Sequence, residues 1–206
     1  AMALVFRLPP AAWTTAIAAL ALGLAGYAAQ GSPDVPGAPK AAAPLVPGEG
    51  ANLVELRRAV LPEELWSSHN ALVTADALTR RDRYADAATI LLGAVRKNSG
   101  DGEAWLALGN NLVSAADGAM TPAAQLAYRQ AEAAAPQSPG APFFIGVYQL
   151  EAGNFLDARR LWAEAAHRAP EGSEARLTIE SRIARLDAVM RQMFKQQQGT
   201  AKTPPN

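Results

Sequence analysis

Residues 104–136 read AWLALGNNLVSAADGAMTPAAQLAYRQAEAAAP and contain the pattern that decides the fold. The first half of this stretch places its large and small side chains in the order Trp105-x2-Leu108-Gly109-x2-Leu112. The second half, after a turn, reads Ala124-x3-Tyr128-x2-Ala131-x4-Pro136. Apolar residues three and four apart indicate amphipathic helices, and small residues between them let two helices cross closely. The stretch therefore predicts two antiparallel helices joined by a turn.

The same pattern recurs on both sides of this stretch. The segment that follows carries it as Ile145-Gly146, Gly153-x-Phe155 and then Ala158-x3-Trp162-x2-Ala165-x4-Pro170. The segment that precedes it is a weaker copy, with Tyr84-x2-Ala87-x3-Leu91-x2-Ala94. Helix pairs that recur about every 34 residues are typical of tetratricopeptide repeats, so we expect three such repeats, with a generic helical bundle as the alternative.

The repeats predict an all-α fold, namely a three-repeat tetratricopeptide superhelix with a C-terminal capping helix. We place this domain at residues 51–197, with repeats at about 68–101, 102–138 and 139–172. The face of a terminal repeat needs a cap, and the apolar residues of 173–197 recur at helical spacing, as Ile179, Ile183, Leu186, Met190 and Met193. A short covering helix at the other end of the array is predicted from Leu53, Leu56 and Val60.

Local signals agree with these boundaries. Thr121-Pro122 predicts the start of a helix, because threonine is a good N-cap and proline suits the first helical position. Gly153-Asn154 is expected to separate the two helices of the third repeat, the glycine ending one helix and the asparagine capping the next. The middle repeat is longer than the third, and its extra residues fall in the turn at 117–121.

The N-terminal segment predicts a membrane anchor. Residues 11–29 read AAWTTAIAALALGLAGYAA, an uncharged stretch that spans about 28 Å as a helix, close to the thickness of a hydrocarbon core. Arg7 precedes it, which favours a cytoplasmic N-terminus and export of the rest. We predict a single membrane-spanning helix within 1–30, with a cleaved signal peptide and a buried soluble helix as alternatives. Residues 31–50, rich in proline and glycine, are expected to form a linker, and 198–206 a disordered tail.

Composition excludes several classes of function. The chain has 19 basic and 19 acidic residues and no cysteine. Without a basic surplus no nucleic-acid binding is expected, and without cysteine there are no disulfides or thiolate nucleophiles. The two histidines, His69 and His167, share no metal-ligand spacing, and each is expected to lie at the surface or to cap a helix. We therefore expect no metal, no cofactor and no catalysis; a haem- or metal-dependent enzyme is the alternative.

The candidate binding site is the inner face of the predicted array. The first helix of each repeat lines the concave surface of such arrays, and the inward positions here are Leu72, Asp76, Thr79, Leu106, Asn110, Val113, Phe143, Val147 and Leu150. All of these except Thr79 are our predicted peptide-binding residues. The set is mostly apolar, which suits an amphipathic helix or an extended apolar peptide, and Asn110 is expected to hydrogen-bond the ligand backbone. The alternative is that these residues pack internally.

Three features together resemble a known family. They are the membrane helix followed by GSPDVPGAP at 31–39, the long turn AADGAMTPAA at 115–124, and the ending FLDARRLWAEAAHRAPEGSEARLTIESRIARL at 155–186. With these features the chain resembles, over residues 11–187, the tetratricopeptide subunit of the bacterial cytochrome c maturation system that is associated with haem lyase (the CcmI/CycH/NrfG type). Many members of that family have two membrane-spanning helices, whereas one is predicted here.

The resemblance implies a function and a location. A member of this family would be a periplasmic domain, held by residues 11–29 in the bacterial inner membrane. It would capture apocytochrome c near its C-terminus and present it to the haem lyase membrane subunits for haem attachment. Lacking cysteine, this chain would serve that process only by holding the client. An adaptor for another cell-envelope assembly, with the same fold and a different client, is the alternative function.

Overall fold

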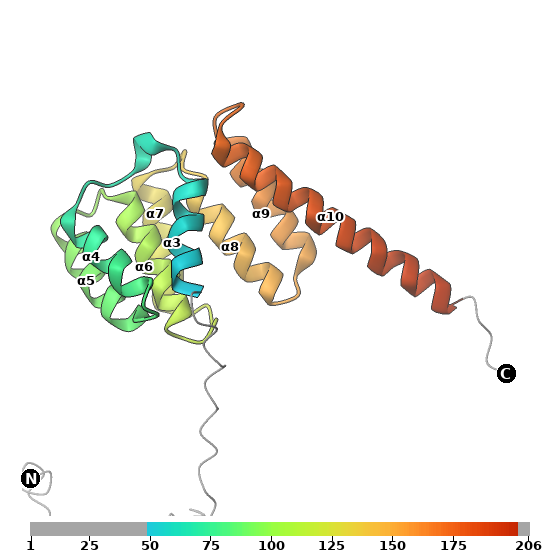
Figure 1. Cartoon of the computed structure of the whole chain (residues 1–206), viewed down its shortest axis with the longest axis horizontal. Helices are drawn as coiled ribbons and strands as arrows, with labels where there is room; N and C mark the ends of the chain where they lie inside the picture. Colours follow the sequence, from blue (N-terminus) through green and yellow to red (C-terminus); the bar gives the residue numbers. More distant parts are fainter. Residues whose placement is uncertain (1–48, 202–206) are drawn as a thin grey trace, which may run out of the picture. The chain divides into compact units, whose positions relative to one another are not determined.

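The computed structural model describes residues 49–201 of the chain. This part contains eight α-helices and one short 3-10 helix, and no residue in it lies in a β-strand (Figure 1). The elements are α3 (Glu49–Val60), η1 (Glu63–Leu65), α4 (Asn70–Thr79), α5 (Tyr84–Lys97), α6 (Gly102–Ser114), α7 (Pro122–Ala134), α8 (Gly140–Glu151), α9 (Phe155–Arg168) and α10 (Glu174–Ala201).

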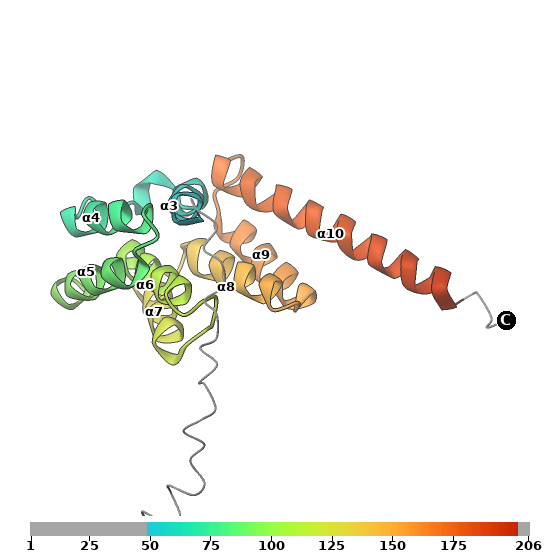
Figure 2. The same cartoon turned by 60° about the horizontal axis from the view of Figure 1, so that its bottom comes forward.

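The helices pack in consecutive pairs. Helix α4 packs on α5, α6 on α7 and α8 on α9, and each pair contacts the next one along the chain (Figure 2). The prediction of an all-α fold is therefore confirmed, and the arrangement is consistent with a helical repeat.

Small residues stand where the paired helices cross. A Cβ atom added at Gly109 of α6 would lie 2.9 Å from Cε1 of Tyr128 in α7, and one added at Gly146 of α8 would lie 2.6 Å from Cδ1 of Trp162 in α9. Such distances are too short for two carbon atoms. The glycine in the first helix and the large aromatic ring in the second therefore depend on each other, which explains why the sequence repeats both.

The local signals at Thr121 and at Gly153-Asn154 mark helix ends in the structure. The Thr121 side chain accepts a hydrogen bond from the backbone N–H of Ala124 at 3.2 Å and caps α7. Gly153 has a φ of +80°, the left-handed conformation that suits a glycine after a helix. Asn154 occupies the position before α9 as predicted, but the expected capping bond is absent, because the side-chain amide donates to Oε1 of Gln149 at 2.8 Å.

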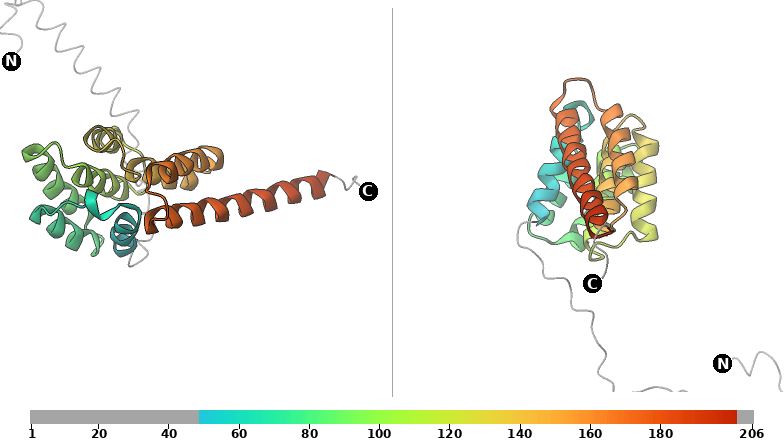
Figure 3. Two further views of the ribbon diagram at one scale, coloured as in Figure 1. Left: turned by 90° about the horizontal axis from the view of Figure 1, so that it is seen from above. Right: turned by 90° about the vertical axis from the view of Figure 1, so that its right-hand side faces the viewer.

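Helix α10 follows the predicted apolar pattern over most of its length. Ile179 and Leu186 are buried, and Met190 packs partly buried against the core, whereas Met193 is 39% exposed. Figure 3 shows α10 (red) running on past the end of α9. The helix continues to Ala201, four residues past the predicted boundary, so residues 198–201 of the predicted tail are helical.

The predicted membrane anchor and most of the predicted linker lie outside the residues that the structure describes. Helix α3 begins at Glu49, so the linker predicted for residues 31–50 ends no later than residue 48. Within residues 49–201, none of the helices combines the length and the apolar character needed to cross a bilayer.

Helix α3 lies in an unexpected place. A helix that contains Leu53, Leu56 and Val60 is confirmed, but its predicted position at the far end of the array is wrong. It contacts α4, α8 and α10, and Figure 2 shows it between α4 on one side and α10 on the other. The N-terminal helix of the domain therefore bridges the first and the last helices that follow it.

Candidate functional site

A buried ion-pair network holds α3 in this position. The guanidinium of Arg57 in α3 donates through Nη2 to Oδ2 of Asp76 in α4 at 2.7 Å, and through Nε to Oε1 of Glu103 in α6 at 3.0 Å. All three residues are buried, Arg57 with only 2% of its surface exposed. The network therefore joins three helices through charges that water does not reach.

Burial and ion pairing shift the pKa values of these groups in opposite directions. Burial alone would lower the pKa of Arg57, but the hydrogen bonds and negative charges of Asp76 and Glu103 raise its pKa above the ordinary value. Burial raises the pKa of Glu103, although Arg57 and a hydrogen bond from the backbone N–H of Ser67 oppose this shift. Arg57 is thus the cation between two buried carboxylates, and removing it leaves their negative charge largely without compensation.

Four of the eight predicted peptide-binding residues are internal. Leu72, Leu106 and Phe143 are buried in the hydrophobic core, and Phe143 stacks on Trp162 with ring centroids 5.9 Å apart. Asp76 is occupied by Arg57. These four residues therefore offer no surface to a ligand in this conformation.

The remaining predicted residues lie closer to open space. Asn110 and Val113 of α6 and Val147 of α8 line one cavity, which Val147 shares with the adjoining groove. Leu150 is partly exposed and packs against the core. The structure thus brings three of the eight predicted residues together at one site.

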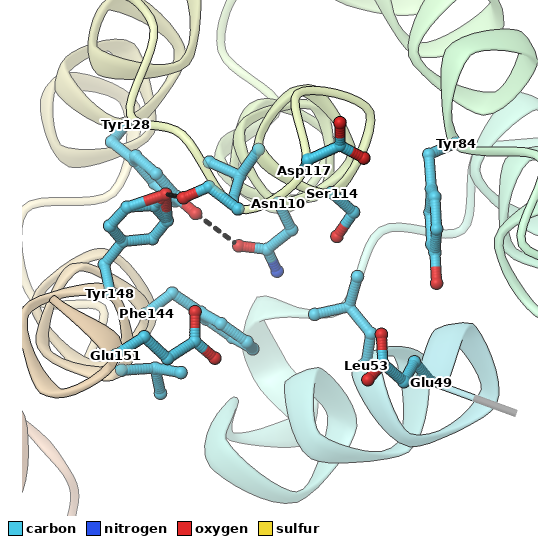
Figure 4. Close-up of a pocket in the computed structure, with 13 residues that line it drawn as sticks. Glu49, Leu53, Tyr84, Asn110, Ser114, Asp117, Tyr128, Phe144, Tyr148 and Glu151 are labelled. Carbon is cyan, nitrogen blue, oxygen red and sulfur yellow. Dashed lines mark hydrogen bonds between the residues drawn. The ribbon is translucent and has the colours of Figure 1, made fainter. Parts of the chain in front are cut away.

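That cavity, which we call the inner cavity, has a volume of about 340 Å³. It lies between α3, α6, α7 and α8 and is closed on one side by the turn after α6 (Figure 4). Its lining residues are Glu49, Leu53, Tyr84, Asn110, Val113, Ser114, Asp117, Gly118, Tyr128, Phe144, Val147, Tyr148 and Glu151.

A wider groove continues from the inner cavity. It has a volume of about 670 Å³ and runs between α3, α8 and α10. The two hollows share Leu53 on α3 and Val147 on α8, so they are continuous. Leu56 and Ala59 of α3 and Arg182 of α10 line the groove beyond them. We call this hollow the α3–α8–α10 groove.

Asn110 forms the floor of the inner cavity. Its Oδ1 accepts a hydrogen bond from the Tyr128 hydroxyl at 2.8 Å. Its Nδ2 is buried, has no hydrogen-bond partner among the described residues, and points toward the residues of α3 that line the cavity on the other side (Figure 4). Buried polar groups in proteins are nearly always paired, so an unpaired donor here is a position at which a ligand acceptor fits.

Acidic side chains surround the mouth of the inner cavity. Glu49, Asp117 and Glu151 all line it, and no ion pair joins any of them to a residue of the described part of the chain. Burial raises the pKa of Glu151, and the negative charge of Glu49 raises it further. The Tyr148 hydroxyl donates to the carbonyl of Gly118 and ties the turn after α6 to α8. The mouth is therefore negatively charged and fixed in position.

Only three of the thirteen residues that line the inner cavity, namely Asn110, Val113 and Val147, were predicted as binding residues. Glu49, Leu53, Tyr148 and Glu151 were not predicted to line it, and no local pattern marks them. The long turn was a usable signal, because Asp117 and Gly118 belong to it and lie at the cavity mouth.

Metal-binding clusters do not occur in residues 49–201. No group of three or more histidine, cysteine, aspartate or glutamate side chains there is close enough to hold a metal ion. His69 caps α4, its Nδ1 accepting a hydrogen bond from the backbone N–H of Ala71 at 3.2 Å, and His167 is exposed in the last turn of α9.

Comparison with known proteins assigns no family to this fold and site. No protein-family model matches the chain, and no curated protein matches it. The resemblance to the cytochrome c maturation subunit stays a prediction.

Proposed function

We propose that this chain is a non-catalytic tetratricopeptide scaffold that captures a segment of a client polypeptide in the α3–α8–α10 groove. The paired helices and the small residues at their crossings support the repeat assignment. The spacing of these residues follows the tetratricopeptide pattern in the second and third helix pairs.

One observation carries the binding function, namely the continuous hollow along α3. Its walls combine apolar side chains, among them Leu53, Leu56 and Val147, with an unpaired buried donor on Asn110. An apolar groove with a few fixed polar groups is the usual form of a peptide site, since apolar contacts give affinity and hydrogen bonds fix the register.

Because α3 covers part of the surface that was predicted to bind the client, the proposed site is smaller than the predicted one. Because α3 lies against α4 and covers the Asp76 region, the proposed client binds beside α3. In this arrangement α3 forms one wall of the site, and α8 and α10 form the other.

The proposed client is apocytochrome c, held near its C-terminus and presented to the haem lyase membrane subunits. This part of the proposal rests on the resemblance of residues 11–187 to the cytochrome c maturation family. The same resemblance and the uncharged stretch at 11–29 support a single-pass anchor in the bacterial inner membrane with the helical domain in the periplasm. The domain would then hold the client close to the membrane, where haem attachment takes place.

Peptide binding to the full chain in detergent tests the proposal. Isothermal titration with a peptide of the apocytochrome C-terminus is expected to show binding that Val147→Asp weakens at least tenfold, because the substitution puts a charge in the apolar wall. Val73→Asp is the matched control, since Val73 is 61% exposed on α4 and lines neither hollow. Equal affinities in the two variants would move the site elsewhere.

Isolation of the chain from membranes tests the identity of the client. Recovery of apocytochrome c together with haem lyase subunits supports the proposal. Recovery of other cell-envelope proteins alone would instead favour the adaptor function, with the groove retained.

A further inference from the structure

We propose that the inner cavity is a subsite for a lysine or arginine residue of the client, with a main-chain carbonyl on Asn110 and the cationic side chain among Glu49, Asp117 and Glu151. This inference rests on the proposed function, since it names the residue type that the groove selects. Three features of the inner cavity support it. They are the unpaired donor of Asn110 at the floor, the carboxylates at the mouth, and the connection of the cavity to the α3–α8–α10 groove.

The floor provides a donor that the domain itself does not use. Asn110 is 3% exposed, and its Nδ2 has no partner among the described residues. Tyr128 holds the other end of the amide through a 2.8 Å bond to Oδ1, so the donor direction into the cavity is fixed (Figure 4). A peptide carbonyl is the acceptor that a client chain presents at every residue.

The mouth provides negative charge without a counter-charge. Glu49, Asp117 and Glu151 come from α3, the turn after α6 and the end of α8, and none is ion-paired with a described residue. These three carboxylates do not form a metal-binding group. The charged end of a long, flexible side chain can approach carboxylates that lie apart from one another, whereas a single metal ion needs all its ligand atoms within about 2.6 Å.

The connection to the groove gives the residue a route into the cavity. Leu53 and Val147 line both hollows, so a chain lying along α3 reaches the inner cavity at these two residues. The aliphatic stem of a lysine or arginine packs against apolar surface while its charged end stays near water. Leu53, Val147 and Phe144 supply that surface. An acidic residue at the same place would meet like charge, so the subsite also rejects anionic segments.

Nuclear magnetic resonance of the full chain in detergent tests the subsite directly. The probes are N-acetyl-lysine-N-methylamide and its norleucine and glutamate analogues, which share one backbone and differ in the side chain. The lysine probe is expected to shift the Asn110 side-chain NH2 signals and to bind at least five-fold more tightly than the norleucine probe. The glutamate probe is expected not to bind.

Two conservative variants separate charge recognition from folding. Glu151→Gln is expected to weaken binding of the lysine probe about five-fold, which is the effect of losing a partly exposed ion pair. Binding of the norleucine probe is expected to stay unchanged. Glu63→Gln is the matched control, because Glu63 is an exposed carboxylate on η1 that does not line the inner cavity. Asp117→Asn provides a second test at a position outside the helices and is expected to act in the same direction as Glu151→Gln.

The outcomes distinguish this inference from the proposed function. Equal affinity for the lysine and norleucine probes, or a shift of the Asn110 signals by calcium ions as large as that by the lysine probe, overturns the subsite. If either result occurs while the apocytochrome peptide still binds and Val147→Asp still weakens it, the groove function stands without the subsite. If the peptide does not bind but the lysine probe does, the proposed function fails and the cavity is a cation site of another kind.

Discussion

Replacing Arg57 with methionine tests whether α3 is an integral wall of the site. Methionine keeps most of the volume of arginine but removes the cation that both Asp76 and Glu103 contact, at 2.7 and 3.0 Å. The side chains of these two carboxylates are each only 3% exposed, so water cannot replace the lost partner. Removing one member of a buried ion pair costs about 3–5 kcal/mol, which is a large share of the 5–15 kcal/mol that holds an ordinary domain folded.

Urea unfolding of the full chain, followed by circular dichroism at 222 nm, measures this loss. Hydrogen exchange of the Val54 amide reports separately on the docking of α3. The control is the triple variant Arg57→Met, Asp76→Asn, Glu103→Gln, which removes all three charges and is expected to recover most of the loss. If the free energy of unfolding of Arg57→Met lies within about 0.5 kcal/mol of that of the wild type, and the α3 amides keep their protection from hydrogen exchange, the network does not hold α3 in place.

The Arg57→Met variant is also expected to depend on pH. Burial already raises the pKa of Glu103 in the folded chain, and loss of Arg57 raises it further. A carboxyl whose folded pKa exceeds its unfolded pKa stabilises the fold at low pH, and this contribution is lost as the pH rises through the folded pKa. The destabilisation is therefore expected to shrink as the pH falls from about 7 toward the ordinary glutamate pKa of about 4.3.

Other substitutions give sharper local tests. Gly109→Ala brings a Cβ atom to 2.9 Å from Tyr128, so it is expected to lower the free energy of unfolding in urea by about 1–3 kcal/mol. Gly93→Ala is the control, because no atom lies within 4 Å of the added Cβ. It is expected to raise the free energy of unfolding by up to about 1 kcal/mol, since alanine favours helix over glycine. Phe143→Ala removes a fully buried ring and should cost about 3–5 kcal/mol; a loss below 1 kcal/mol would contradict its place in the core. Binding of the lysine probe should weaken as the pH falls, beginning above the ordinary carboxylate range because burial and Glu49 raise the pKa of Glu151, and a flat titration profile would contradict this.

The helix pairs were predictable because their determinants are local. Glycine and a large aromatic residue at fixed spacing describe one crossing, as Gly109 with Tyr128 and Gly146 with Trp162 show. Caps such as Thr121 are likewise set by neighbouring residues.

The place of α3 was not predictable, because its contacts join residues far apart in the sequence. Arg57 lies on the same helix face as Val54 and Val60, at spacings of three, and that buried face was the only sign that a charged residue faces inward. Nothing local shows that its partners are Asp76 and Glu103, which lie 19 and 46 residues away.

The position of α3 also explains why some of the predicted binding residues line the inner cavity and others do not. Asp76 was predicted to contact a ligand, but Arg57 of the chain itself forms an ion pair with it. Asn110 keeps an unpaired donor, because none of the described residues gives its Nδ2 an acceptor. The position of each residue in its repeat does not show whether the side chain is buried in the core, paired with α3 or open to a cavity.

Photo-crosslinking in the native membrane tests the capture of a client in the groove most directly. A photoreactive amino acid replaces Val147 in the full chain, and in a parallel strain it replaces the exposed Val73. Mass spectrometry then identifies the captured polypeptides. We expect crosslinks to the C-terminal segment of apocytochrome c from position 147 and none from position 73. No polypeptide crosslinked at position 147, or the same products from both positions, would contradict it.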